Sequence, residues 1–200
     1  MSSKLIAEYE SLARHTTIGT GGAARRYAEP SSTAELQVLL AQARSEGWPV
    51  EVIGLGSNVL VHDDGVDALV LRLVGELAAV RIDGKSMIAG GGATNAVCLH
   101  RARDAGLGGF EFASAIPGTA GGGVRMNAGA YGSDWSDVLH SAVIVDALGV
   151  REVSVRDLDL SYRHSGLRAG EVVAEVRYEL VPRDPAEIRA TAAEIGRAHV

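Results

Sequence analysis

Apolar and polar positions along the chain predict short strands, glycine-rich turns and a few helices. Residues 32–47 have a helical pattern, because Ser32 and Glu35 form a capping-box sequence and apolar residues follow at helical spacing. A second helix is expected over 94–105, and a third begins at Asp184-Pro185 and is expected to run to the chain end. Strands are expected where apolar runs are bounded by Gly, Pro or Asp, at 49–54, 68–73, 78–82, 86–89, 138–146, 150–155 and 172–181.

The order of these elements favours an α+β fold. Helices and strands alternate too irregularly for a doubly wound parallel sheet. A boundary between a small N-terminal α/β unit and a larger unit is expected near residues 72–76. We identify no internal repeat and no low-complexity segment.

Composition narrows the class of protein. The net charge is −6, with no basic tail and few aromatic residues, which argues against nucleic acid as a partner. The six histidines have no metal-binding spacing, and the single cysteine cannot form an internal disulfide, so we expect no bound metal. The N-terminus carries acids where a signal peptide needs an apolar run, and no segment reaches the roughly 18 apolar residues of a membrane span. We therefore expect a cytoplasmic protein that does not contact a membrane.

The segment 110–132 is the most informative part of the chain. It combines Pro117 with glycines at 118, 121–123 and 129, and it has no acidic residue after Glu111. Glycine allows bare backbone N–H groups to approach an anionic ligand. A flexible linker is the alternative, but linkers do not usually contain residues such as Ile116.

A second donor-rich segment lies at Gly54-Leu55-Gly56-Ser57-Asn58. It offers backbone N–H groups, a hydroxyl and an amide, which together suit phosphate oxygens, although a plain β-turn would have the same sequence. Two such loops in one domain suit a pyrophosphate better than a single phosphate. Gly84-Lys85-Ser86 does not complete a P-loop, because the first glycine would fall at Ala79. Gly54-Leu55-Gly56 does not complete a Rossmann motif, because the third glycine is missing and a strand-like segment, 59–61, follows in place of a helix.

Tyr162-Arg163-His164-Ser165 adds a cation after the apolar pair Leu158 and Leu160, and we expect that cation to be buried. The planar guanidinium of Arg163 matches a carboxylate. A structural ion pair with Asp157 or Asp159 explains the same pattern equally well. His164 is expected near the site without performing chemistry.

Together these segments resemble the UDP-N-acetylenolpyruvoylglucosamine reductases, also called UDP-N-acetylmuramate dehydrogenases. Four motifs carry the resemblance in the family's order, over about residues 15–195. They are His15-Thr-Thr-Ile-Gly-Thr-Gly-Gly-Ala-Ala24, Val52-Ile-Gly-Leu-Gly-Ser-Asn-Val-Leu-Val61, Ile116-Pro-Gly-Thr-Ala-Gly-Gly-Gly-Val-Arg-Met-Asn-Ala-Gly-Ala-Tyr-Gly132 and Tyr162-Arg-His-Ser165.

The resemblance implies an FAD-binding fold of the vanillyl-alcohol-oxidase type, also called the PCMH type, in which FAD is held noncovalently between two subdomains. These would cover 1–74 (small, α/β) and 75–183 (larger, α+β), and the helix at 184–200 would start a substrate domain that the chain lacks. NADPH would be the co-substrate and a UDP-sugar the substrate, in peptidoglycan precursor synthesis, with the protein acting as a monomer. The implied cofactor residues are Gly54, Leu55, Gly56, Ser57, Asn58, Ile116, Pro117, Gly118, Thr119, Gly122, Gly123, Asn127 and Ala128.

The resemblance also assigns catalysis. Arg163 would stabilise the negative charge that develops on the substrate carboxylate during hydride addition. The family's general-acid serine and its assisting glutamate have no counterpart in this sequence. The alternatives are therefore an FAD-binding module without reductase activity and a flavin oxidase with another substrate.

Overall fold

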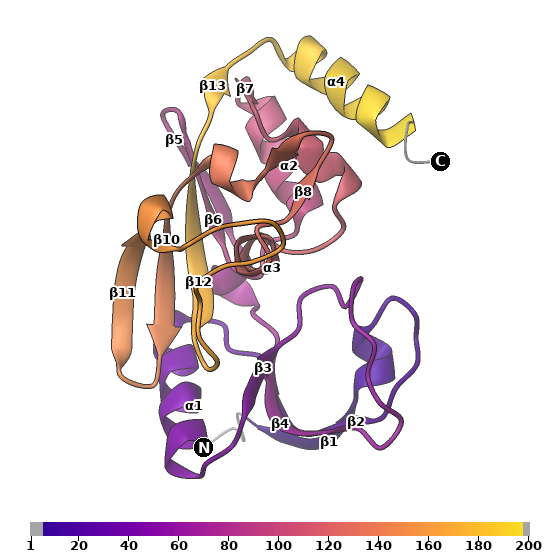
Figure 1. The fold of residues 1–200 in the computed structure, drawn as a ribbon, viewed down its shortest axis with the longest axis vertical. Coiled ribbons are helices and arrows are strands. Elements are labelled where there is room, and N and C mark those ends of the chain that lie inside the picture. Colours follow the sequence, from indigo (N-terminus) through magenta and orange to yellow (C-terminus); the bar gives the residue numbers. More distant parts are fainter. Residues whose placement is uncertain (1–5, 198–200) are drawn as a thin grey trace.

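The computed structural model describes residues 6–197 and places two sheets in two lobes (Figure 1). The small lobe has the strand order β1-β2-β4-β3, and the large lobe has the order β11-β10-β12-β6-β5. The small sheet comprises β1 (Ala7–Ser11), β2 (Ala23–Ala28), β3 (Val50–Val52) and β4 (Val66–Leu71). The large sheet comprises β5 (Val80–Asp83), β6 (Ser86–Gly90), β10 (Leu139–Asp146), β11 (Gly149–Ser154) and β12 (Val172–Glu179).

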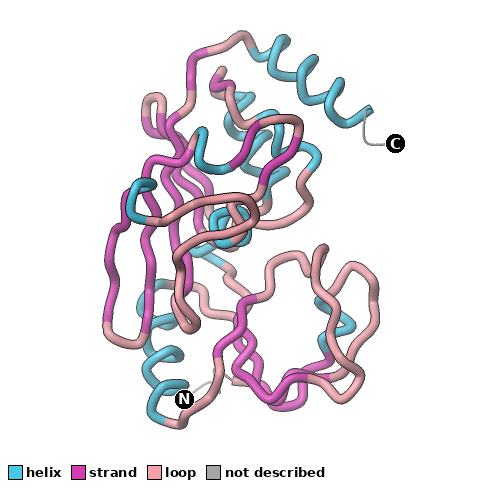
Figure 2. The backbone as a smooth tube through the Cα atoms, in the orientation of Figure 1, coloured by secondary structure: helices cyan, strands magenta, loops and turns pink. Residues whose placement is uncertain are grey.

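Pairing differs between the two sheets. In the small sheet β4 pairs parallel with both β2 and β3, whereas every pair in the large sheet is antiparallel. Two short antiparallel pairs complete the described strands. The strands β7 (Leu107–Gly108) and β13 (Val181–Pro182) pair although they are distant in the sequence, and β8 (Gly129–Ala130) and β9 (Ser133–Asp134) form a hairpin. The α+β fold class is confirmed, and Figure 2 shows the helices grouped around the sheets without regular alternation.

Helix α1 (Thr33–Ser45) connects the two lobes. Its buried side chains, including Leu36 and Leu40, share one core with Leu69 of the small sheet and with Val145 and Val172 of the large sheet. Burial of this apolar face against both sheets stabilises the arrangement of the two lobes. Helix α1 therefore sets the separation of the sheets and, with it, the space between them.

The expected capping box of α1 forms with a shift of one residue. The Ser32 hydroxyl accepts from Glu35 N at 3.3 Å, as expected. The Glu35 carboxylate, however, accepts from the backbone N and the hydroxyl of Ser31, at 2.7 and 2.8 Å. These donors lower the pKa of Glu35, with the backbone bond contributing most.

The large lobe holds an aromatic core. Phe110, Phe112, Trp135 and Tyr178 are buried together under helices α2 (Asn95–Asp104) and α3 (Ala120–Arg125), with edge-to-face ring contacts. The indole Nε1 of Trp135 donates to the Tyr178 hydroxyl at 2.9 Å. Helix α4 (Pro185–Arg197) lies at the outer end of this lobe, and residues 198–200 of the helix expected there lie outside the described part of the chain.

Most expected elements are present, and the exceptions are informative. The segment 59–61 reads as a strand but lies in a loop, where Leu60 is 82% exposed. Strands β1 and β2 and the short helix α3 were not expected from the pattern. The boundary expected near 72–76 falls in the connection between β4 and β5, and the division into 1–74 and 75–183 stays a prediction.

Candidate cofactor site between the two sheets

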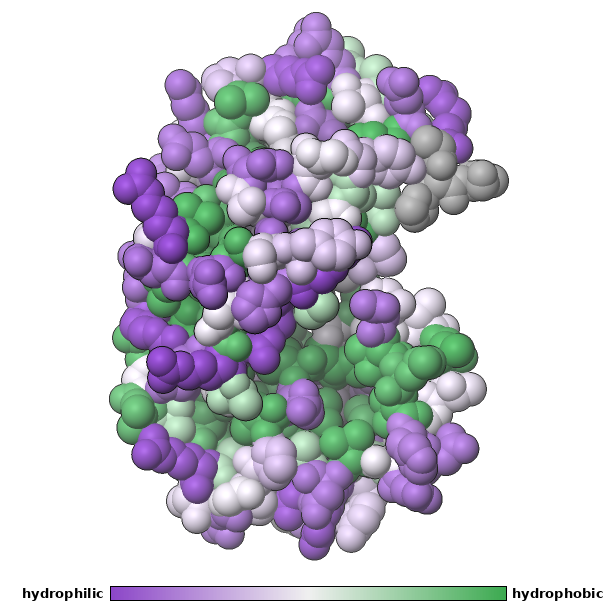
Figure 3. Space-filling model, viewed as in Figure 1, coloured by the Kyte–Doolittle hydropathy of each residue, from purple (hydrophilic) through white to green (hydrophobic). Residues whose placement is uncertain are grey.

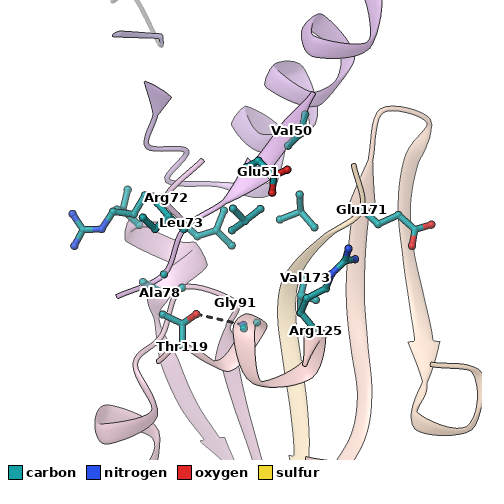
Figure 4. Close-up of a pocket in the computed structure, with 18 of the residues that line it drawn as sticks. Val50, Glu51, Arg72, Leu73, Ala78, Gly91, Thr119, Arg125, Glu171 and Val173 are labelled. Atoms are coloured by element: carbon teal, nitrogen blue, oxygen red, sulfur yellow. Dashed lines mark hydrogen bonds between the residues drawn. The ribbon is translucent and has the colours of Figure 1, made fainter. Parts of the chain in front are cut away.

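A cavity of about 470 Å³ lies between the lobes (Figure 4). The hollow between the lobes is visible on the space-filling surface, with apolar side chains gathered beside it on the small lobe (Figure 3). Backbone from both glycine loops lines this cavity, together with apolar walls and three arginines. The lining includes Val50, Val52, Gly54, Leu55, Arg72, Leu73, Gly91, Gly92, Thr94, Thr119, Gly121, Gly122, Arg125, Arg168, Glu171 and Val173.

The two predicted loops meet although they lie more than 50 residues apart in the sequence. A Cβ built on Gly54 would lie 2.8 Å from the Thr119 hydroxyl oxygen, so the backbones can approach this closely only with glycine at 54. The Ser57 hydroxyl donates to the carbonyl of Pro117 at 2.8 Å. The prediction that both loops form one site is therefore supported by their contact at the cavity.

The first loop divides into lining and supporting residues. Gly54 and Leu55 line the cavity, whereas Gly56 packs against the chain at His15. Gly56 has φ +61°, a Cβ there would overlap the His15 carbonyl oxygen, and its own carbonyl accepts from Thr17 N at 3.0 Å. Ser57 and Asn58 lie outside the lining, and the Ser57 hydroxyl already donates its hydrogen to the Pro117 carbonyl.

The second loop is partly helical. Thr119 is the N-cap of α3, and its hydroxyl accepts from Gly122 N at 3.4 Å, the bond dashed in Figure 4. Gly121 N donates to Gly91 O at 2.8 Å, which ties the helix to the glycine segment after β6. Thr119, Gly121 and Gly122 line the cavity, while Gly118 lies beside Thr119 but outside the lining.

Gly123 has a packing role that the sequence did not reveal. Its N–H donates to Thr119 O at 2.9 Å, so the expectation that this N–H faces a ligand is wrong. A Cβ on Gly123 would overlap the Trp135 ring, which lies directly against the helix. Glycine is needed there because of the aromatic core.

Unpaired backbone N–H groups nevertheless remain where the two loops meet. Within residues 6–197, the backbone N–H groups of 54–58 and those of Gly118 and Thr119 donate to no protein acceptor. Free N–H groups from two loops beside one cavity form the arrangement that binds phosphate oxygens. The apolar walls at Val50, Val52 and Leu73 suit a flat ring system. The residues present therefore fit FAD.

The other predicted cofactor residues support the loop from outside the cavity lining. Ile116 packs against the core of the large lobe, and Pro117 is exposed. Ala128 is buried, and its N–H donates to the Gly123 carbonyl at 2.9 Å. Asn127 is 4% exposed and fully engaged, because Nδ2 donates to Ser161 O and Oδ1 accepts from Ser136 N, both at 3.1 Å. No contact of these residues with the cavity is present.

Arg163 lies apart from the cavity. Ser161 and His164 pair through two 3.1 Å backbone hydrogen bonds, so Tyr162 and Arg163 form the tip of a tight turn. Arg163 has φ +55°, is exposed and donates from Nη2 to Gly129 O at 3.2 Å. The expected burial is therefore wrong, and so is the alternative ion pair with Asp157 or Asp159, because the Arg163 guanidinium pairs with a carbonyl instead.

Sequence reasoning missed the cavity's arginines. Arg125 donates from Nη1 to the carbonyls of Leu167 and Arg168, at 2.9 and 3.1 Å, and so holds the loop at 165–171 over the cavity. Arg72 points away from the centre, toward Glu29 at 3.4 Å. Glu29 also accepts from the Tyr27 hydroxyl at 2.7 Å. The pKa of Tyr27 is raised, mainly because the phenol is partly buried and also because the Glu29 carboxylate lies beside it. No local signal distinguishes these arginines from surface ones, because their placement depends on tertiary contacts.

The described residues contain no cluster of three or more His, Cys, Asp or Glu placed to hold a metal ion. Nor does any helix in that part of the chain have the length and apolar character needed to cross a membrane.

Comparisons with known proteins agree with the site. Residues 24–154 match the family model described as an FAD binding domain. UDP-N-acetylenolpyruvoylglucosamine reductase 2 of Symbiobacterium thermophilum is 42% identical over 185 residues, which are 92% of this chain and 60% of that protein. The reductase of Rubrobacter xylanophilus is 43% identical over 182 residues, 90% of this chain and 61% of its own length. The chain thus spans about three fifths of these curated relatives.

Solved structures share the fold. The crystal structure of the UDP-N-acetylenolpyruvylglucosamine reductase of Thermus caldophilus superposes with a TM-score of 0.84 at 34% identity, covering 96% of this chain and 68% of that one. A solvent-stable cholesterol oxidase, at 21% identity and a TM-score of 0.66, covers 88% of this chain and 38% of its own and shares the fold alone. The expected FAD-binding fold of the vanillyl-alcohol-oxidase type is confirmed.

Proposed function

Because the chain belongs to the family of UDP-N-acetylenolpyruvoylglucosamine reductases, we propose that it binds FAD noncovalently in the cavity between its two sheets. One observation carries this proposal: the loop at 54–58 meets Gly118 and Thr119 at the cavity, and the backbone N–H groups of these residues donate to no acceptor in the described part of the chain. These groups would hold the pyrophosphate, and the apolar wall would hold a ring of the cofactor.

The reaction proposed for the complete protein is reduction of the enolpyruvyl group of UDP-N-acetylenolpyruvoylglucosamine to give UDP-N-acetylmuramate, with NADPH as reductant, in cytoplasmic peptidoglycan precursor synthesis. When bound, FAD would carry the hydride. Arg163 would stabilise the charge on the substrate carboxylate, since its exposed guanidinium leaves donors free beside the bond to Gly129 O. We propose that the protein acts as a monomer on this small-molecule substrate.

The alternative is an FAD-binding module without this reductase activity. The separation of Arg163 from the cavity favours it, because the proposed catalytic cation and the proposed cofactor contacts do not share one wall in this chain. NADPH oxidation that depends on the enolpyruvyl sugar distinguishes the two. We expect such turnover to be absent or very weak in the 200-residue chain, and turnover at a full enzymatic rate would reject this expectation.

Replacing Arg163 with alanine tests the assignment of roles. We expect Arg163→Ala to bind FAD as tightly as the unchanged chain, because Arg163 lies outside the cavity lining. Flavin absorbance retained by the protein after gel filtration measures this binding. Loss of the flavin from Arg163→Ala, with the fold intact by circular dichroism, would place the arginine at the cofactor instead.

A further inference from the structure

Three successive carbonyl groups fix the loop that carries Gly118 and Thr119. The Ile116 carbonyl accepts from Asn95 Nδ2 at 2.9 Å, the Pro117 carbonyl accepts from the Ser57 hydroxyl at 2.8 Å, and the Gly118 carbonyl accepts from Asn95 N at 3.0 Å. Asn95 is the first residue of α2 and thus binds the loop on both sides of Pro117. The two side chains that donate, those of Asn95 and Ser57, both lie outside this loop.

These bonds orient the free donors of the loop. In a trans peptide the N–H group points opposite to the C=O group of the same plane. Fixing the Pro117 carbonyl therefore fixes Gly118 N–H, and fixing the Gly118 carbonyl fixes Thr119 N–H. The Ile116 carbonyl shares its plane with the nitrogen of Pro117, which carries no hydrogen, so the bond from Asn95 Nδ2 acts on Gly118 N–H through the locked φ of Pro117. These two N–H groups donate to no protein acceptor within residues 6–197, and Thr119 lines the cavity.

The side-chain oxygen of Asn95 destabilises the fold. Its side chain is 2% exposed, and its Oδ1 is buried without a hydrogen-bond partner in the described part of the chain. An unpaired buried acceptor is destabilising, and an apolar residue of the same shape avoids that cost. Stability alone therefore does not account for an asparagine at this position.

We propose that Asn95 is a positioning residue, which presets the Gly118 and Thr119 N–H groups for the pyrophosphate of FAD. The inference rests on the proposed FAD function. Asn95 acts through the loop, and its amide donor toward Ile116 O is the group that matters. The unpaired buried oxygen of Asn95 destabilises the fold, and the bond to Ile116 O offsets part of that cost. The positioning of the two N–H groups adds a benefit when the anion binds.

Two replacements at Asn95 test the proposal, with FAD affinity measured by isothermal titration calorimetry and stability by thermal unfolding of the cofactor-free protein. Asn95→Leu removes both the donor and the orphan acceptor. We expect a nearly unchanged melting temperature, because loss of the bond to Ile116 O offsets removal of the unpaired oxygen, and an FAD dissociation constant raised about tenfold, as for loss of one net hydrogen bond.

Asn95→Asp tests whether restoring the side-chain donor restores FAD affinity. The carboxylate has no donor and repels the Ile116 carbonyl, but a protonated carboxyl group can donate to it again. We expect the ratio of its FAD dissociation constant to that of the unchanged chain to fall toward one as the pH is lowered. Ser32→Ala is the stability control, because it removes the cap of α1 far from the loop and should lower the melting temperature without changing affinity.

Equal FAD affinity of Asn95→Leu and the unchanged chain would overturn this inference, as would a ratio for Asn95→Asp that does not vary with pH. Failure of the unchanged chain to bind FAD would instead reject the proposed function.

Discussion

At the scale of single residues, the glycines of the site have different purposes that the sequence alone does not distinguish. Gly54 allows two loops to touch, Gly56 takes a left-handed conformation against His15, and Gly123 leaves room for Trp135. The glycine-rich pattern predicts two loops that hold a ligand, and the structure places residues of both segments at one cavity. It could not show which N–H groups stay free, because that depends on contacts with residues far along the chain, such as Gly123 with Trp135.

Gly123→Ala tests the packing role. The added Cβ would overlap the Trp135 ring, so we expect the free energy of unfolding to fall by about 1–3 kcal/mol, the usual cost of overpacking. Chemical denaturation followed by tryptophan fluorescence measures the change. Gly122→Ala in the same helix is the control, since its Cβ would lie 3.4 Å from the Thr119 hydroxyl oxygen, an ordinary contact distance, and should cause no such loss. Equal effects of the two replacements would contradict the packing role.

Cys98 gives a second test at this scale. The thiol is fully buried on α2, and desolvation raises its pKa to about 12. The reactive thiolate is therefore scarce at neutral pH, and we expect alkylation of the native protein to be limited by opening of the fold. Labelling followed by mass spectrometry at increasing denaturant should track unfolding. Rapid labelling of the native chain would show that the Cys98 thiol on α2 is accessible to solvent, contrary to its burial in the structure.

At the scale of elements, the sequence predicted those whose signals are local. Helix α1 was predicted from its cap and its leucine spacing, and β10 and β12 from their apolar runs. Helix α3 was not predicted, because three adjacent glycines disfavour a helix. It forms through the Thr119 cap and the bond from Gly121 N to Gly91 O, and the second of these is a tertiary contact.

Leu36→Ala in α1 tests whether this helix joins the lobes. Leu36 is fully buried in the core shared by both sheets, so its truncation should lower the free energy of unfolding by about 2–5 kcal/mol. The two tryptophans report on the two regions, Trp48 beside Arg26 of the small sheet and Trp135 in the large core. Fluorine NMR of labelled tryptophan should show both signals lost at one, lower denaturant concentration.

The exposed Val38 of the same helix supplies the matched control, and Val38→Ala should change the unfolding free energy by less than about 0.5 kcal/mol. Loss of the Trp48 signal alone in Leu36→Ala would show that the lobes unfold independently.

At the scale of the whole molecule, the site exists because two lobes hold distant loops together. The sequence motifs predict that two glycine loops hold the cofactor, and the structure adds the cavity between the sheets and the contact of Gly54 with Thr119. The cavity arginines and the exposure of Arg163 follow from the placement of loops, which no local pattern encodes. We propose that FAD binds where the two loops meet.

An equilibrium titration with FAD tests this claim most directly, comparing the unchanged chain with Gly54→Ala and with Gly149→Ala. A Cβ at Gly54 would press against the Thr119 side chain, whereas one at Gly149 meets nothing within 4 Å. We predict one FAD bound per chain, an affinity lowered about tenfold or more in Gly54→Ala, equivalent to roughly 1.4 kcal/mol, and no change in Gly149→Ala. An unchanged affinity in Gly54→Ala, or no FAD binding by the unchanged chain, would contradict the account.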